Sequence, residues 1–466
     1  MMSKYKTLII DFFVFAFGSV GSKIVVFFLV PFYTNILSAE EYGIADLVFT
    51  FTELLMPLAC VTIYDAILRF GLENKKNPEN TMLCGILVWA AGCGITLVLL
   101  PLLGLYQPIA PWKWYIYAHV NASILLSISL NYLKVKNKNL RYSLISILQT
   151  ATLAGLNILL LAVFKIGVKG YLLSNTIAAI VAAVSAFLAG NVIGDLKSAK
   201  FDKTLLRNMV IYSAPLILNS VSWWVIHSSN KIMIEFFAGA AALGLFTVAS
   251  RIPSLINVFV TIFQQSWGIS SITEMDSTND SSFYETVFQC YTICVLFACL
   301  MLNTIIKPFM GIYVAEEFFS SWTMVPLLVV SAAAFSSIAA FFGSLYGALK
   351  KSVNNMLTTL ASAVTNLVVG YFLISKIGAM GAVISTLIAY GVLAISRMLD
   401  VGRYVKFRVG YMNYAVNCLI LIVHAIAVMM DFYIVPASVI AVIVFLLYNR
   451  RYMMDILLKF KQMVTK

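Results

Sequence analysis

The sequence is dominated by long, nearly uninterrupted apolar stretches that are separated by short polar turns. Most have about twenty residues or more, which at about 1.5 Å of helix per residue is enough to cross a hydrocarbon core of about 30 Å. The pattern therefore predicts an all-α polytopic membrane protein with about fourteen transmembrane helices. The predicted spans are residues 8–34, 41–68, 82–105, 113–133, 142–164, 170–193, 208–236, 241–270, 284–306, 321–349, 353–374, 379–400, 411–430 and 432–448.

Composition agrees with this pattern and excludes a soluble globular protein. Hydrophobic residues make up 61% of the chain, charged residues 11%, and the mean hydropathy is +0.93. A soluble domain has an apolar fraction nearer half and a charged fraction nearer a quarter. The chain is therefore expected to lie in a lipid bilayer.

The basic residues predict how the chain is oriented in that bilayer. With the N-terminus placed in the cytoplasm, 24 of the 32 Lys and Arg residues fall in cytoplasmic segments, five fall in outer segments and three lie inside spans. Short cytoplasmic loops of membrane proteins are enriched in Lys and Arg. We therefore expect both termini in the cytoplasm, and we do not interpret the net charge of +12 as a sign of nucleic-acid binding.

Two turns predict an internal repeat of six spans. A shift of 201 positions aligns residues 41–44 with 242–245, and a shift of 211 aligns 165–167 with 376–378. Because six is even, both copies share one orientation and should be related by a pseudo-two-fold axis along the membrane normal. The alternative is a chance likeness of short glycine-containing turns. The repeat predicts one six-helix bundle at 1–195, a second at 196–402, and helices 13 and 14 with a basic tail at 403–466.

The three cations inside the apolar stretches are Lys23, Lys231 and Arg251. A cation at membrane depth is costly unless it faces a partner or a wet cavity. Lys23 and Arg251 are expected near mid-depth, about 22 and 15 Å of helix from the start of their spans, and Lys231 is expected closer to the outer surface. They predict an internal chamber for a negatively charged substrate.

The second predicted span carries acids that complete this pattern. Asp46 and Glu53 share one helical face, and the 201 shift aligns Arg251 with Thr50, one turn from Glu53. One interpretation is a salt bridge between the halves that opens when an anionic headgroup or a proton arrives. The alternative is a permanent structural ion pair.

Asp65 and Arg69 lie four residues apart near the inner end of the same span. They either pair locally along the helix or take part in ion coupling and gating. Pro57 and Pro253 lie within the second and eighth spans, where proline bends a helix and frees a carbonyl group. The bends are interpreted as hinges.

The seventh span predicts a polar and aromatic path for substrate. Trp223, His227 and Lys231 follow one another at i, i+4 and i+8, so they form one stripe on a helix. Gln265 shares the face of Arg251 and extends a polar track toward the cytoplasm. The stripe suits a sugar-phosphate group, and the alternative is an aromatic belt at the membrane interface.

Motifs that would point to an enzyme or an ATPase are missing from the sequence. There is no Gly-Lys-Ser/Thr phosphate-binding loop, no His-Glu-x-x-His and no Gly-x-Ser-x-Gly. We therefore expect no catalytic residues, no metal and no cofactor, and a proton or sodium gradient is the candidate source of energy.

The chain resembles the polysaccharide-transporter or O-antigen flippase branch of the multidrug/oligosaccharidyl-lipid/polysaccharide exporter superfamily. The resemblance covers essentially the whole chain. Its best markers are residues 31–43, which read PFYTNILSAEEYG, and Lys231-Ile232-Met233-Ile234 with Gly239 and Leu243-Gly244-Leu245-Phe246.

This resemblance implies a flippase of the bacterial inner membrane that translocates undecaprenyl-diphosphate-linked oligosaccharide repeat units in polysaccharide and lipopolysaccharide biosynthesis. It implies that Lys23 and Arg251 contact the diphosphate, and it adds polysaccharide-assembly proteins as candidate partners. Members often carry an acid before the basic residue of span 7, where this chain has Asn230. That difference shifts the expected ion-coupling role to Glu53, Asp46 and Asp65.

Three alternatives remain. A multidrug exporter of the same fold would expel organic cations from a net acidic chamber, and a second alternative is an exporter of another lipid-linked polysaccharide precursor. A membrane-embedded polymerase or acyltransferase would need a catalytic cluster, whereas His119, His227 and His424 are scattered singly along the sequence.

Overall fold

The computed structural model describes residues 25, 27–73, 77–277, 281–349, 351–405 and 410–464. Throughout these ranges the chain forms helices joined by turns, and ten of the helices are long and apolar enough to cross a membrane. The protein is therefore an all-α polytopic membrane protein, as the apolar pattern predicts. Most of the first predicted span, including Lys23, lies outside the described residues.

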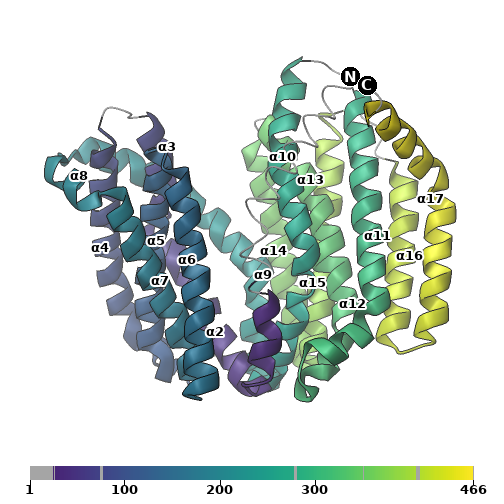
Figure 1. Ribbon diagram of the computed structural model, residues 1–466. Coiled ribbons are helices and arrows are strands. Elements are labelled where there is room, and N and C mark those ends of the chain that lie inside the picture. Colours follow the sequence, from purple (N-terminus) through teal and green to yellow (C-terminus); the bar gives the residue numbers. More distant parts are fainter. Residues whose placement is uncertain are drawn as a thin grey trace. The chain divides into compact units, whose positions relative to one another are not determined.

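The chain divides into two compact units, which we call unit 1 (residues 1–31 and 233–466) and unit 2 (residues 32–232). Figure 1 labels their helices. Unit 2 contains α2 (Ala39–Cys60), α3 (Ile63–Glu73), α4 (Pro78–Leu103), η1 (Ala110–Trp112), α5 (Lys113–Val135), α6 (Asn139–Asn157), η2 (Ile158–Val163), α7 (Val168–Gly190), α8 (Val192–Ser198) and the first part of α9 (Lys203–Arg251).

Unit 1 contains the end of α9 and the remaining helices. These are α10 (Ser254–Ser277), α11 (Ser281–Tyr313), η3 (Glu316–Thr323), α12 (Val325–Leu328), η4 (Val329–Phe335), α13 (Ser336–Ala348), α14 (Ser352–Ile377), α15 (Ala379–Val401), α16 (Tyr411–Met429) and α17 (Ile434–Val464). The two compact units are divided at residues 31 and 232, whereas the predicted boundaries at residues 195 and 402 come from a repeat in the sequence. The predicted domain boundaries stay a prediction.

The core of unit 1 is built from stacked aromatic side chains of α10, α11 and α13. The rings of Phe263 and Tyr291 stack at 4.0 Å between centroids, and Trp267 stacks on Phe341 at 4.6 Å. Trp267 also donates an indole hydrogen bond to the carbonyl oxygen of Phe341 at 3.2 Å. Buried tryptophan needs such a partner because its N–H has lost its contact with water.

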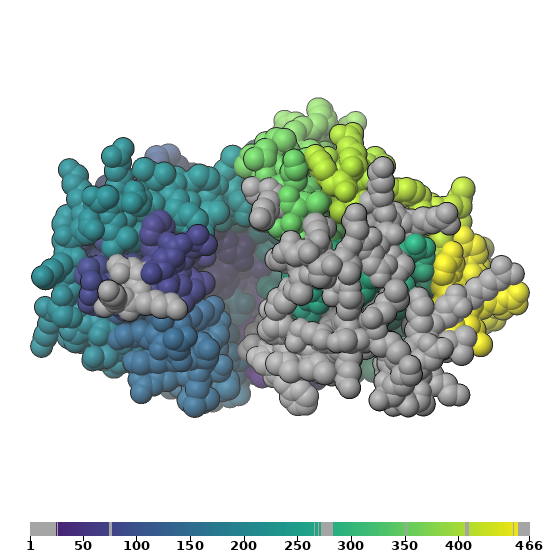
Figure 2. Space-filling view, turned by 90° about the horizontal axis from the view of Figure 1, so that it is seen from above, coloured from purple at the N-terminus to yellow at the C-terminus, as the bar shows by residue number. Residues whose placement is uncertain are grey.

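Buried hydrogen bonds between side chains join helices α16 and α17 into a hairpin. Asn417 and Asn449 exchange amide hydrogen bonds of 3.0 and 2.7 Å, and His424 Nε2 lies 2.9 Å from Ser438 Oγ. Figures 1 and 2 both place α17, in yellow, at the edge of unit 1. The last two predicted spans therefore form a tightly joined pair of helices at the edge of this unit.

A non-helical residue precedes a helix at residue 38 and again at residue 239, 201 positions later. Ser38 caps α2 with its side chain, which accepts from the backbone N–H of Glu41 at 3.2 Å, and Glu41 accepts in return from the N–H of Ser38 at 3.0 Å. The position 201 residues later is Gly239, where α9 is interrupted by a φ of 85° and a ψ of 167°. Ser38 has φ −68° and ψ 165°, so the two positions share ψ but differ in φ. The break therefore separates the predicted spans 7 and 8.

The second matched turn repeats its backbone conformation more closely. Gly167 has φ 64° and ψ −142°, and Gly378, 211 residues later, has φ 57° and ψ −140°. Each glycine precedes a long helix, α7 or α15. Residues with a Cβ atom rarely adopt this conformation, so glycine is required at both positions.

Two predicted spans are each divided into two helices. The span 241–270 is interrupted at Ile252–Pro253, between α9 and α10, because proline cannot continue the hydrogen-bond ladder. The span 41–68 is interrupted at Val61 and Thr62, which have φ of 51° and 49°. Pro57, the residue expected to bend this span, lies inside α2 one turn earlier.

Substituting Gly378 with Ala should destabilise unit 1. Alanine in this positive-φ conformation costs about 1–3 kcal/mol, so the thermal unfolding midpoint in detergent should fall. The matched control is Gly347→Ala, because Gly347 is helical and exposed, with open space where a Cβ would lie, and alanine favours helix. Equal midpoints for the two variants would contradict the requirement for glycine at 378.

Candidate functional site

The polar residues of α2 and α9 meet in one line of contacts within unit 2, which we call the α2–α9 seam. It consists of Asp46, Thr50 and Glu53 from α2 and of Trp224, Ser228 and Lys231 from α9. The α2 residues recur at i, i+4 and i+7, and the α9 residues at i, i+4 and i+7, so each set occupies one helical face.

An ion pair between Lys231 and Asp46 lies in this seam. Lys231 Nζ is 2.9 Å from Asp46 Oδ2, and the side chains are 17% and 6% exposed, respectively. Both charges lie within apolar helices, where an unpaired charge is costly. Their pairing explains how Lys231 is accommodated although its neighbour in the sequence is Asn230.

Glu53 occupies a different environment in the same seam. Ser228 donates a hydrogen bond of 3.1 Å to Glu53 Oε2, and the Glu53 side chain is largely exposed on unit 2. Trp224 donates from Nε1 to the carbonyl oxygen of Thr50 at 2.9 Å. Pro57 lacks an N–H group, so it removes the helical hydrogen bond that the Glu53 carbonyl oxygen would otherwise accept. The seam thus holds one carboxylate that is paired with a cation and one that accepts a hydrogen bond from a hydroxyl group.

The predicted aromatic stripe lies on an adjacent face of α9. The rings of Trp223 and His227 stack at 5.5 Å between centroids with an interplanar angle of 16°. His227 is exposed on unit 2, and the helix is continuous from these residues to Lys231. A substrate-lining role for this stripe stays a prediction.

Arg251 lies in unit 1, at the last residue of α9. It is half-buried, and its carbonyl oxygen accepts a hydrogen bond from the hydroxyl group of Ser254 across the break at Pro253. A cation at a helix C-terminus is favoured by the helix dipole. Gln265 falls within α10, but its side chain lies outside the described residues. The predicted pairing of Arg251 with Glu53 joins two different units and stays a prediction.

Asp65 and Arg69 lie in α3 without forming a pair with each other. Arg69 instead pairs with Glu73 at 2.8 Å, where the side chains are 62% and 54% exposed. Exposed pairs of this kind contribute about 0–1 kcal/mol. Asp65 is half-buried in the first turn of α3, directly after the break at Val61 and Thr62.

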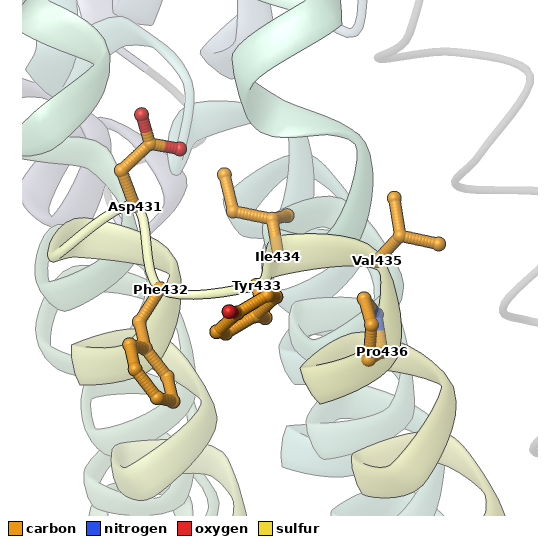
Figure 3. A pocket seen from close by; sticks show the side chains of 6 residues that line it. All are labelled: Asp431, Phe432, Tyr433, Ile434, Val435 and Pro436. Atoms are coloured by element: carbon orange, nitrogen blue, oxygen red, sulfur yellow. The ribbon is translucent and has the colours of Figure 1, made fainter.

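Sequence reasoning did not single out the turn between α16 and α17. Lys307 pairs with Asp431 at 2.5 Å and lies 5.0 Å from the centre of the Trp322 ring. An open pocket on this turn is lined by residues 431–436. Figure 3 shows the Asp431 carboxylate pointing away from the rings of Phe432 and Tyr433. The pocket is formed by one turn and includes none of the predicted site residues.

These features define the class of the protein as a multi-pass helical membrane protein with charged residues placed within its apolar helices. Within the described ranges, no group of three or more His, Cys, Asp or Glu side chains is placed to hold a metal ion.

Comparison with solved structures identifies the fold. The structure of lipid II flippase MurJ in an inward closed conformation matches with a TM-score of 0.71 and 14% identity over 96% of this chain and all of that chain. An outward-facing multidrug resistance MATE family transporter of the MOP superfamily matches with a TM-score of 0.59 and 15% identity over 89% and 96%. A MOP superfamily transporter from Pyrococcus furiosus gives 0.59 and 14% over 87% and 96%. The chain therefore has the MurJ and MATE fold.

The family follows from a sequence comparison. The family model described as "Polysaccharide biosynthesis protein" matches residues 8–267, which is more than half of the chain, so the chain belongs to this family. The predicted resemblance is confirmed. No curated protein matches the chain. The chain therefore belongs to a polysaccharide biosynthesis family and has the fold seen in a lipid II flippase and in a MATE family transporter.

Removing one partner of the Asp46–Lys231 pair should destabilise unit 2 more than removing both charges. Lys231→Met leaves a buried carboxylate without its cation, which costs up to about 3–5 kcal/mol, whereas a pair replaced by uncharged residues is often nearly neutral. Thermal unfolding of Lys231→Met and of Asp46→Asn/Lys231→Met in detergent measures this difference.

The control for this pair is Lys169→Met, which removes an exposed cation of α7 in the same unit. It should leave the midpoint unchanged. If the double variant is no more stable than Lys231→Met, the two side chains are not energetically coupled.

Proposed function

We propose that this protein is a flippase that translocates undecaprenyl-diphosphate-linked oligosaccharide repeat units across the bacterial inner membrane. The translocation occurs by alternating access between two six-helix bundles, related by a pseudo-two-fold axis, in a chain of fourteen spans with both termini in the cytoplasm. The observation that carries this proposal is a half-buried cation, Arg251, at a helix break inside a span of a polysaccharide biosynthesis protein.

The chemistry of a diphosphate suits the predicted cations. A diphosphate ester carries negative charge on several oxygens, and guanidinium groups bind such oxygens through two parallel hydrogen bonds. Arg251 and Lys23 together supply two positive charges for this group. The sugar then occupies the polar chamber while the lipid tail stays in the bilayer, so no hydrocarbon has to cross a wet space.

Lys231 neutralises Asp46, one of the two acids of the α2–α9 seam. The second acid, Glu53, accepts a hydrogen bond from the neutral Ser228 hydroxyl group. The proposal of an anionic substrate therefore depends on Arg251 and Lys23 and not on the seam. The fold shared with a lipid II flippase over 96% of this chain is consistent with a lipid-linked substrate.

Glu53 is the residue we assign to ion coupling or gating. The Glu53 carboxylate accepts a hydrogen bond from one hydroxyl group, and binding a proton would remove its charge. A sodium ion would need several oxygen ligands, so a proton is the better candidate for the coupling ion. Protonation would release any cation that Glu53 attracts and thereby change the balance between inward-open and outward-open states. Assembly proteins that lengthen or export the polysaccharide are the expected partners.

Arg251→Ala should reduce translocation of a lipid-linked diphosphate oligosaccharide about tenfold or more. A hydrogen bond to a charged group contributes about 1.5–3 kcal/mol, and 1.4 kcal/mol corresponds to about a factor of ten. The measurement is the rate at which a fluorescent lipid-linked diphosphate becomes accessible in the opposite leaflet of proteoliposomes, with Lys23→Ala tested in parallel.

Lys376→Ala is the matched control, because Lys376 is an exposed cation at the end of α14 in the same unit as Arg251. Its translocation rate should equal that of the unmodified protein. Normal transport by both Arg251→Ala and Lys23→Ala would overturn the proposal, and export of cationic drugs in place of lipid-linked sugars would favour the multidrug alternative.

Glu53→Gln should abolish the response of transport to an imposed proton gradient. The glutamine side-chain oxygen still accepts the hydrogen bond from Ser228, so the seam keeps its contact but loses its negatively charged carboxylate. Ser228→Ala is the control, because it removes the hydrogen bond and keeps the carboxylate. A Glu53→Gln protein whose rate still follows the proton gradient would exclude Glu53 as the coupling residue.

A further inference from the structure

Each unit contains a buried tyrosine whose hydroxyl group donates a hydrogen bond to an aspartate. The aspartate lies near the end of the sixth predicted span of its half. In unit 2, Tyr132 of α5 donates to Asp195 Oδ2 at 2.7 Å. In unit 1, Tyr346 of α13 donates to Asp400 Oδ2 at 2.8 Å. The tyrosines are fully buried, and the aspartate side chains are 19% and 16% exposed, respectively.

The two arrangements occupy equivalent places in the predicted repeat. Tyr346 follows Tyr132 by 214 positions, and Asp400 follows Asp195 by 205 positions, which is within four positions of the shifts of 211 and 201 of the two matched turns. Each joins the fourth predicted span of its half to the sixth. In Figure 1, α8, which carries Asp195, lies across the upper ends of the unit 2 helices.

Further polar contacts surround each aspartate. Lys136 binds Asp195 and donates to the carbonyl oxygen of Gly190 at 3.0 Å, so it links α5 to the end of α7. Asn354 of α14 donates to Asp400 Oδ2 at 2.9 Å. The contacts on Asp195 therefore tie α5 to the α7–α8 corner, and the contacts on Asp400 tie α13 and α14 to α15.

A second fastening lies one turn before Asp400. Arg397 is buried and donates to the carbonyl oxygen of Ala339 at 2.8 Å and to Thr359 Oγ1 at 2.9 Å. Gly343 provides the space, because a Cβ there would lie 2.6 Å from Arg397 Nη1. The end of α15 is thus bonded to both neighbouring helices.

Helix stability does not explain the placement of Asp400. A carboxylate in the last turn of α15 lies at the negative end of the helix dipole, which is unfavourable by about 0.3–1 kcal/mol. Asp400 accepts hydrogen bonds from two other helices. We therefore attribute its stabilising effect to the joining of those helices. The same use of an acid in both units argues for a common mechanical role.

We propose that Tyr132–Asp195 and Tyr346–Asp400 are two equivalent clamps that make the helices of each unit move as one body during transport. This inference rests on the proposed function, since alternating access requires that each bundle turns without its helices separating. Asp195 and Asp400 are positioning residues in this scheme. They act through the helices that they join.

The test replaces a clamp with a covalent link. In protein whose seven native cysteines are substituted, Tyr132→Cys/Asp195→Cys should translocate lipid-linked diphosphate at least tenfold more slowly, because two hydrogen bonds to a charged group are lost and each corresponds to about a factor of ten or more. Joining the two cysteines with a bifunctional methanethiosulfonate reagent should restore the rate. Tyr346→Cys/Asp400→Cys should behave in the same way, and the single-cysteine variants treated with the reagent should not recover.

A cross-linked protein that stays slow, or becomes slower, would overturn the inference, because the clamp would then have to open during the cycle. Hydrogen exchange gives a readout that does not depend on transport. Tyr132→Phe should increase exchange at α8 only, and Tyr346→Phe at the end of α15 only, and unchanged exchange would also overturn it. If the unmodified protein does not translocate the lipid while exchange rises as expected, the proposed function fails and the clamps stand.

Discussion

The constraint on which this structure depends is the cost of placing charge inside apolar helices. The ion pair of Lys231 with Asp46 is the clearest response to it, because both side chains are nearly buried and both lie in helices that are otherwise apolar. A buried pair adds little net stability compared with apolar residues of the same size, but removing one partner is severely destabilising. The pair therefore fixes which face of α2 meets which face of α9.

The same constraint separates the roles of the charged residues. The Asp46 carboxylate already has a cation at 2.9 Å, which neutralises it. Glu53 lies seven residues along the same face, and in the seam it accepts a hydrogen bond from the uncharged Ser228. One seam thus contains an acid paired with a cation and an acid that accepts a hydrogen bond from a hydroxyl group, and the two are distinguished by their contacts and not by their depth.

The sequence predicted the class of fold because long apolar spans, the bias of Lys and Arg, and glycine-containing turns are properties of local segments. Gly167 and Gly378 were recognisable as a repeat because both turns need the same glycine-dependent conformation. The break at Pro253 was predictable for the same reason, since a missing N–H group acts locally. These elements do not depend on knowing which helices are neighbours.

The partner of Lys231 could not be predicted in this way. Asp46 is 185 residues earlier, and no local pattern states which helix faces α9. The clamp residues Asp195 and Asp400 were overlooked because acids near span ends are ordinarily solvated, and only the structure reveals the buried tyrosines that bind them. The periodicity of the sequence does not predict which side chains of distant helices pair with each other.

The two breaks within predicted spans differ in what maintains them. Pro253 interrupts its span through its own covalent structure, so that break persists whatever surrounds it. Val61 and Thr62 are β-branched residues with positive φ, a conformation that costs about 1–3 kcal/mol per residue. Thr62 is held there by donating to the Ser213 carbonyl oxygen at 3.1 Å and accepting from the Ser213 hydroxyl group at 3.5 Å. Without the Ser213 contacts the strain would favour a straight span, so this break depends on a neighbouring helix of the same unit, whereas the break at Pro253 does not.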